Sequence, residues 1–96
     1  MSDTAIGLLR LELRIEHAHS LKDRRQVVRS LKERLRHRFN VSVAEVGGQD
    51  TWQRASVSIV AVSGDRAYVE EALQAVEQDA AAQLGPMLVG AQIEFW

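Results

Sequence analysis

Residues 20–39 read SLKDRRQVVRSLKERLRHRF, which is the pattern of an amphipathic helix lying on a sheet. Drawn on a helical wheel at about 100° per residue, the apolar side chains fall in one arc. They are Leu21, Val28, Leu31, Leu35 and Phe39. Ser20 is a good N-cap, and the Asp23 carboxylate can interact favourably with the free amides of the first turn. The stretch therefore predicts a helix that buries one side and exposes the other.

The segments around this helix have the alternation of strands. Residues 4–15 alternate over most of their length, residues 40–46 are rich in valine, and residues 54–63 alternate again. Gly47-Gly48 lies between the last two segments, so they are expected to pair as a hairpin. Residues 87–95 predict a final strand whose apolar residues share one face. These are Met87, Val89, Ala91, Ile93 and Phe95.

A second helix is predicted between the hairpin and the last strand. Ser63-Gly64-Asp65 precedes it, Gly85-Pro86 ends it, and its apolar positions are Val69, Ala72, Leu73, Val76 and Ala80. The order of elements is then β-α-β-β-α-β. That order indicates an α+β, ferredoxin-like fold with a four-stranded antiparallel sheet and two helices on one face. We expect residues 1–96 to form a single domain.

The composition restricts the class of protein. Apolar residues make up 46% and charged residues 26% of the 96, as in ordinary globular proteins. No apolar run approaches the roughly 20 residues of a membrane span, and the first residues lack the layout of a signal peptide. A cytoplasmic protein without membrane contact is expected. Because the chain has no cysteine, disulfides, thiol nucleophiles and cysteine-based zinc sites are excluded.

The predicted first helix also carries most of the positive charge. Lys22, Arg25, Arg29, Lys32 and Arg36, here called the basic ridge, recur at alternating spacings of three and four and so follow one side of the helix. Residues 22–38 have a net charge of +6 and the remaining residues −7. Such a ridge can follow a phosphate backbone, with Arg24, Arg34 and Arg38 adding to its field. The alternative is a solvated helix face, on which Glu33 is spaced to pair with Arg29 and His37.

Two further residues are candidates for contacts with RNA. Trp52 and Arg54 lie next to the predicted hairpin turn, where an indole can stack on a base or pack over the sheet edge. Sheet-face recognition of the RRM type is excluded, because residues 55–63 contain no aromatic side chain for bases to stack on.

No residue pattern indicates an enzyme, a metal or a cofactor. His17 and His19 have no third ligand at a set spacing. Ser20 beside His19 and Asp23 is explained by helix capping, and residues 16–19 contain no glycine to cradle a phosphate. The apolar residues expected on the uncovered sheet face predict an interface instead. Ile6, Leu8, Val60 and Val62 are the candidates, and a homodimer is the simplest partner.

Three blocks resemble the YlxP-like bacterial proteins, a family of small domains of unknown function. They are SLKDRR at 20–25, RFNVSVAE at 38–45 and WQRA at 52–55. The resemblance implies a ferredoxin-like fold, a bacterial cytoplasmic protein and no established catalytic residue. Genes for such proteins often lie among those for translation initiation and ribosome maturation, which favours ribosomal or other structured RNA as a partner. We therefore expect a noncatalytic RNA- or ribosome-associated domain. A homodimeric structural or protein-interaction module without nucleic-acid binding is the alternative.

Overall fold

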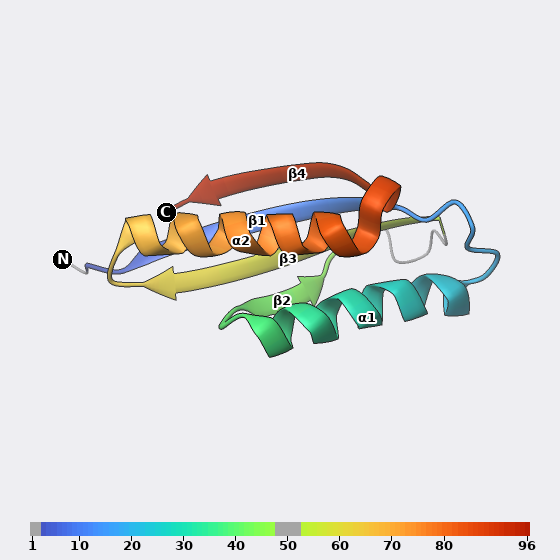
Figure 1. Ribbon diagram of the computed structural model, residues 1–96, viewed down its shortest axis with the longest axis horizontal. Helices are drawn as coiled ribbons and strands as arrows, with labels where there is room; N and C mark the ends of the chain where they lie inside the picture. Colours follow the sequence, from blue (N-terminus) through green and yellow to red (C-terminus); the bar gives the residue numbers. More distant parts are fainter. Residues whose placement is uncertain (1–2, 48–52) are drawn as a thin grey trace.

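The first strand alternates buried and exposed residues along its whole length, as its sequence predicts. The computed structural model describes residues 3–47 and 53–96, which form four strands, two α-helices and one short 3-10 helix (Figure 1). Their bounds are β1 Ala5–Arg14, α1 Leu21–Arg38, β2 Ser42–Glu45, β3 Arg54–Ser63, α2 Arg66–Leu84, η1 Gly85–Met87 and β4 Leu88–Phe95. The β-α-β-β-α-β order confirms the predicted ferredoxin-like plan.

The sheet is antiparallel with the strand order β2-β3-β1-β4. Its two central strands pair over ten residues, from Ala5 opposite Ser63 to Arg14 opposite Arg54. Strands β2 and β3 form the predicted hairpin. Helix α2 packs on β1, β3 and β4, whereas α1 packs on β2 and β3. Both helices lie on the face that carries the buried residues of β1. The other face, here called the open face, has no helix over it in the described chain.

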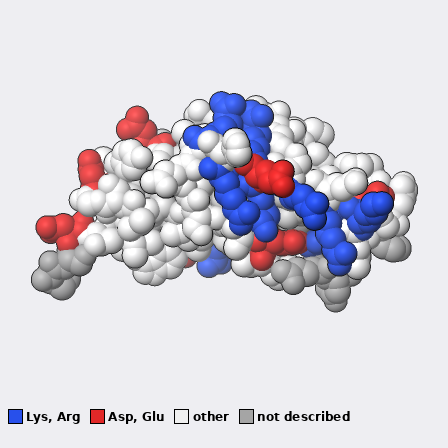
Figure 2. Space-filling model, turned by 90° about the horizontal axis from the view of Figure 1, so that it is seen from below, with Lys and Arg blue, Asp and Glu red and all other residues white. Residues whose placement is uncertain are grey.

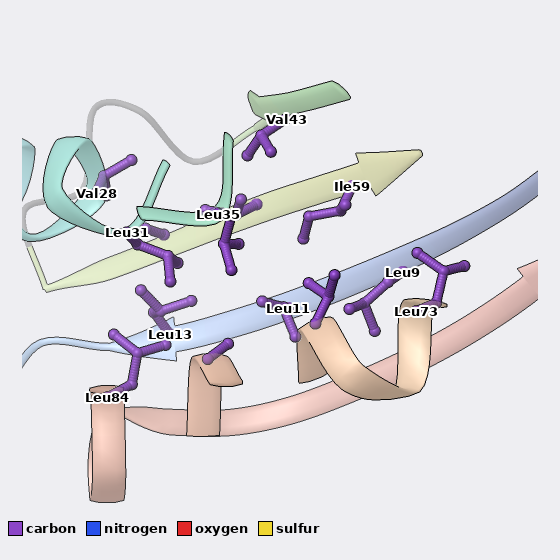
Figure 3. Packing of buried hydrophobic residues seen from close by; sticks show 14 of the residues in the cluster. Leu9, Leu11, Leu13, Val28, Leu31, Leu35, Val43, Ile59, Leu73 and Leu84 are labelled. Carbon is purple, nitrogen blue, oxygen red and sulfur yellow. The ribbon is translucent and has the colours of Figure 1, made fainter. Parts of the chain in front are cut away.

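The two helices begin and pack as their sequences indicate. Ser20 Oγ accepts a hydrogen bond from Asp23 N at 3.2 Å, and Asp65 Oδ1 accepts one from Ala67 N at 2.9 Å. Side chains from both helices meet those of β1 and β3 in one core (Figure 3). The core residues of the helices are Val28, Leu31, Leu35, Val69, Leu73, Val76, Ala80 and Leu84. Of the helices in residues 3–47 and 53–96, none is both long enough and apolar enough to cross a membrane.

Helix α2 lies close to β1 at Gly7. A Cβ atom at this position would lie 2.6 Å from Val69 Cγ1 and 2.7 Å from Leu73 Cδ1. Contacts between carbon atoms are normally 3.5–4.0 Å, so the Val69 and Leu73 side chains would have to move to make room. Glycine at this position therefore allows α2 to lie flat on the sheet.

The prediction that the apolar residues of the last strand share one face is wrong at the beginning of β4. Leu88 pairs with Leu13 and Gly90 pairs with Glu12, so Val89 is an extra residue in a β-bulge. The bulge reverses the alternation, because a one-residue shift moves every side chain to the other face. Leu88 packs against the core instead, and Val89 is 56% exposed.

Candidate nucleic-acid interface

The basic ridge lies on the solvent side of α1, because Val28, Leu31 and Leu35 occupy the side that faces the sheet. Lys22, Arg25, Arg29 and Arg36 are exposed, and Lys32 is partly exposed. Figure 2 shows Lys and Arg side chains gathered over one part of the molecule, whereas the described charged residues at its left end are acidic. The charge asymmetry of the sequence thus becomes an asymmetry of the surface.

Four of the five ridge residues surround one hollow between α1 and the edge strand β2. Its volume is about 300 Å³, and its lining residues are Arg25, Val28, Arg29, Lys32, Glu33, Arg36 and Glu45. Arg36 Nη2 donates a hydrogen bond to Val43 O at 2.8 Å, which holds this guanidinium against β2. A guanidinium has five donors, so this single bond leaves others for a ligand. The hollow is therefore a place where several cationic groups converge.

None of the five ridge residues forms an ion pair within the part of the chain that the structure describes. The pairs of Glu33 with Arg29 and His37, which the solvated-face interpretation predicts, are not formed there. Glu33 instead lies at the edge of the hollow. The four cations of the hollow outnumber its two carboxylates, Glu33 and Glu45, so the field there stays positive for an external anion.

Two other arginines of α1 are used differently, which corrects the expectation that they add to the field. Arg34 holds the Asp79 carboxylate of α2 in a two-pronged contact, with Nε–Oδ2 at 2.9 Å and Nη2–Oδ1 at 3.1 Å. Arg38 Nε lies 3.3 Å from Asp79 Oδ1. The hydrogen bonds from Arg34 lower the pKa of Asp79 and raise the pKa of Arg34 itself. These charges join the two helices, and Asp79 offsets part of their field.

Arg24 was also expected to add to the field of the ridge, but it is buried. Its side chain is 1% exposed; the guanidinium pairs with the Glu45 carboxylate, and Nε donates to Arg54 O at 2.7 Å. Arg24 thereby joins the first turn of α1 to the end of β2 and the start of β3. Arg24 lies four residues before Val28 and seven before Leu31, so it falls within the apolar arc of the helical wheel. This spacing indicates that its side chain faces the sheet.

Arg54, the described one of the two hairpin candidates, does not join the ridge. Trp52 lies outside the described residues. Arg54 begins β3 opposite Arg14, and the next residue, Ala55, is in the core, so the Arg54 side chain lies on the open face. The ridge is on the other side of the sheet. Within residues 3–47 and 53–96, Arg54 is linked to α1 through its carbonyl, which accepts the hydrogen bond from Arg24.

The four dimer candidates are brought together on the open face. Ile6 pairs with Val62 and Leu8 with Val60 across the two central strands. Antiparallel partners point their side chains to the same face, so these four are neighbours. Ile6, Val60 and Val62 are exposed and Leu8 is partly exposed, so they form an apolar group on this surface.

The turn between β1 and α1 offers little chemistry among the described residues. His19 N donates to Asp23 Oδ2 at 3.0 Å, which continues the cap of α1. No three His, Asp or Glu side chains gather at one point in residues 3–47 and 53–96.

Comparisons with solved structures support the fold alone. A de novo designed protein, Foldit4, has a TM-score of 0.58 at 16% identity, covering 97% of this chain and 96% of its own. SnoaB, a cofactor-independent oxygenase from Streptomyces nogalater, has a TM-score of 0.52 at 10% identity, covering 99% and 92% of the two chains.

Comparisons of sequence are more specific. "Uncharacterized protein YlxP" of Bacillus subtilis (strain 168) is 46% identical over 71 residues, which are 74% of this chain and 77% of that protein. The family model described as "Protein of unknown function (DUF503)" matches residues 6–92. This match spans α1, the hollow and most of the sheet, and it shows that the chain belongs to the YlxP-like DUF503 family.

Proposed function

We propose that this chain is a noncatalytic RNA-binding domain, associated with ribosomal or other structured RNA, that holds a phosphate backbone along the basic ridge of α1. The proposal is supported chiefly by the hollow between α1 and β2, where Arg25, Arg29, Lys32 and Arg36 converge without forming an ion pair among the described residues. Phosphate oxygens are strong hydrogen-bond acceptors and carry negative charge, so they are the ligands that such a cluster of cationic donors binds best.

The shape of the ridge suits an extended anion better than a small one. Lys22 and Arg36 are fourteen residues apart on one helix, and a rise of 1.5 Å per residue separates them by about 21 Å. The described residues around the hollow include no aromatic side chain on which a base can stack. Recognition is therefore expected through the backbone, with weak preference for sequence.

The decisive experiment measures affinity for ribosomal RNA fragments as a function of salt concentration. Each phosphate that a cation neutralises releases counterions, so log K falls with log salt by about 0.7 per contact on single-stranded RNA. Replacing Arg25 and Arg29 with Gln is expected to flatten this slope by about 1.4. The melting temperature should change little, because both side chains are exposed.

A matched control is available on the same helix. The double substitution Arg34→Gln and Arg38→Gln removes the same charge, but from residues already paired with Asp79. It should alter the salt slope less than the ridge substitutions do. Equal effects of the two double variants, or wild-type affinity of the ridge variant, would remove the ridge as the binding site.

A structural or protein-interaction module is the second candidate, and the exposed apolar residues of the open face favour it. This candidate predicts that the protein does not bind RNA even at low salt. It also predicts that the variant with Arg25 and Arg29 replaced by Gln still binds the same protein partners. A pull-down from lysate with and without ribonuclease separates the candidates, because only partners held through RNA are lost after digestion.

A further inference from the structure

The open face carries a compact group of apolar side chains at one end of the sheet. Of the two facing pairs, Ile6 is 38%, Val60 37% and Val62 61% exposed, and Leu8 is partly exposed. Single exposed apolar residues are ordinary on protein surfaces, but a contiguous group marks an interaction site.

Trp96, which follows the last strand, enlarges this group. Trp96 N donates to Ile6 O at 2.9 Å, and Ile6 N donates to Trp96 O at 3.4 Å. These two bonds continue the pairing of β4 with β1 by one residue, so the indole shares the open face with Ile6. Trp96 is 66% exposed. The five side chains Ile6, Leu8, Val60, Val62 and Trp96 are here called the apolar patch.

The charges around the patch have both signs. Arg10 Nε lies 3.6 Å from Glu94 Oε1, and Glu12 Oε2 accepts a hydrogen bond from Ser56 Oγ at 2.5 Å. Arg14 opposite Arg54 follows along the same face. A surface of mixed sign is poorly matched to a polyanion, which needs one sign throughout, but it can complement a rotated copy of itself.

The size of the face also suits a partner of the same dimensions. The strands have ten, four, ten and eight residues, and at about 3.3 Å per residue and about 4.8 Å between strands they make a flat area of roughly 500 Å². The accessible area is larger than this, because side chains corrugate the surface. It approaches the roughly 800 Å² that each partner buries in an ordinary specific interface.

We infer that the open face binds a second copy of this chain in a twofold dimer centred on the apolar patch. In a twofold interface each patch meets its own equivalent, so Trp96 of one protomer is covered by its partner. Helix α1 lies on the other side of the sheet in both protomers. The two basic ridges then point outward, and dimerisation leaves them accessible.

Sedimentation velocity over a wide range of concentrations tests the dimer directly. Val62→Asp places a charge in the patch and is expected to raise the dissociation constant of the dimer at least about tenfold. Tyr68→Asp is the control: it also places a charge at an exposed apolar residue, 54% exposed, but on α2, which covers the other face of the sheet. This control should dimerise as the wild type does.

The fluorescence of Trp96 gives a second measurement that does not depend on a disruptive variant. In the Trp52→Phe background Trp96 is the single indole, and its emission should shift to the blue as concentration rises. A wild-type protein that remains a monomer at high concentration, or a Val62→Asp variant that dimerises as tightly as Tyr68→Asp, would overturn the proposal. Neither outcome bears on RNA binding, because the ridge is unchanged in every variant.

Discussion

The inner and outer sides of α1 use the same residue type in opposite ways. Arg24 and Arg25 are adjacent in sequence, yet Arg24 is buried against Glu45 whereas Arg25 is exposed at the edge of the hollow. The environment therefore decides what each arginine does. On the inner side a charge must be matched by partners, because burial without them is very costly. On the outer side the charge is stabilised by water and remains available to a ligand.

The largest expected effect is on the inner side. Arg24→Ala removes the guanidinium partner of Glu45 and the donor to Arg54 O, so the free energy of unfolding should fall by about 3–5 kcal/mol. Urea denaturation measures this loss. The double variant with Glu45→Ala should recover part of it, because the carboxylate then no longer requires a partner. A loss below about 0.5 kcal/mol in the single variant would contradict the contrast between the two sides.

The next effect compares a core residue with a ridge residue two positions earlier. Leu31 is fully buried, and Leu31→Ala should lower the free energy of unfolding by about 2–5 kcal/mol through lost burial and a cavity. Arg29→Ala should change it by no more than about 0.5 kcal/mol, because the side chain is exposed and unpaired among the described residues. Equal losses from the two substitutions would mean that the helix is oriented differently.

The smallest expected effect on stability concerns Arg34 and Arg38, which contact Asp79 of α2. Because hydrogen bonds from Arg34 lower the pKa of Asp79, the folded state favours the ionised carboxylate. This contribution is present above the ordinary Asp pKa of about 3.9 and is lost as pH falls through the lower value of the folded state. Asp79→Asn should therefore reduce stability at neutral pH and make it less sensitive to acid. Thermal unfolding between neutral and acidic pH measures this, and an unchanged acid dependence would contradict it.

Much of the fold was predictable because periodicity dominates it. The alternation of β1 and β3, the caps at Ser20 and Asp65, and the stop at Gly85 each have a local physical cause. The bulge at Val89 was not predictable, because one extra residue leaves the apolar composition of β4 unchanged and alters only its phase.

The candidate site divides in the same way. The ridge follows from spacing on a single helix, so it could be identified from sequence. The hollow depends on Arg36 reaching Val43, and the contacts of Arg34 and Arg38 with Asp79 depend on how the two helices meet. These are tertiary relations that no local pattern contains. Arg24 could have been found, because it lies on the apolar arc, but its residue type suggested the surface.

The bulge of β4 and the Arg36–Val43 contact have a shared consequence for aggregation. A sheet with two free edges offers rows of unpaired backbone groups on which foreign strands can assemble. Here β2 is only four residues long and one of its carbonyls is already bonded to Arg36, while β4 is interrupted by its bulge. Both edges are therefore poor templates for further strands. Concentrated protein is expected to resist fibre growth, and any ordered association should use the face of the sheet and stop at a closed dimer.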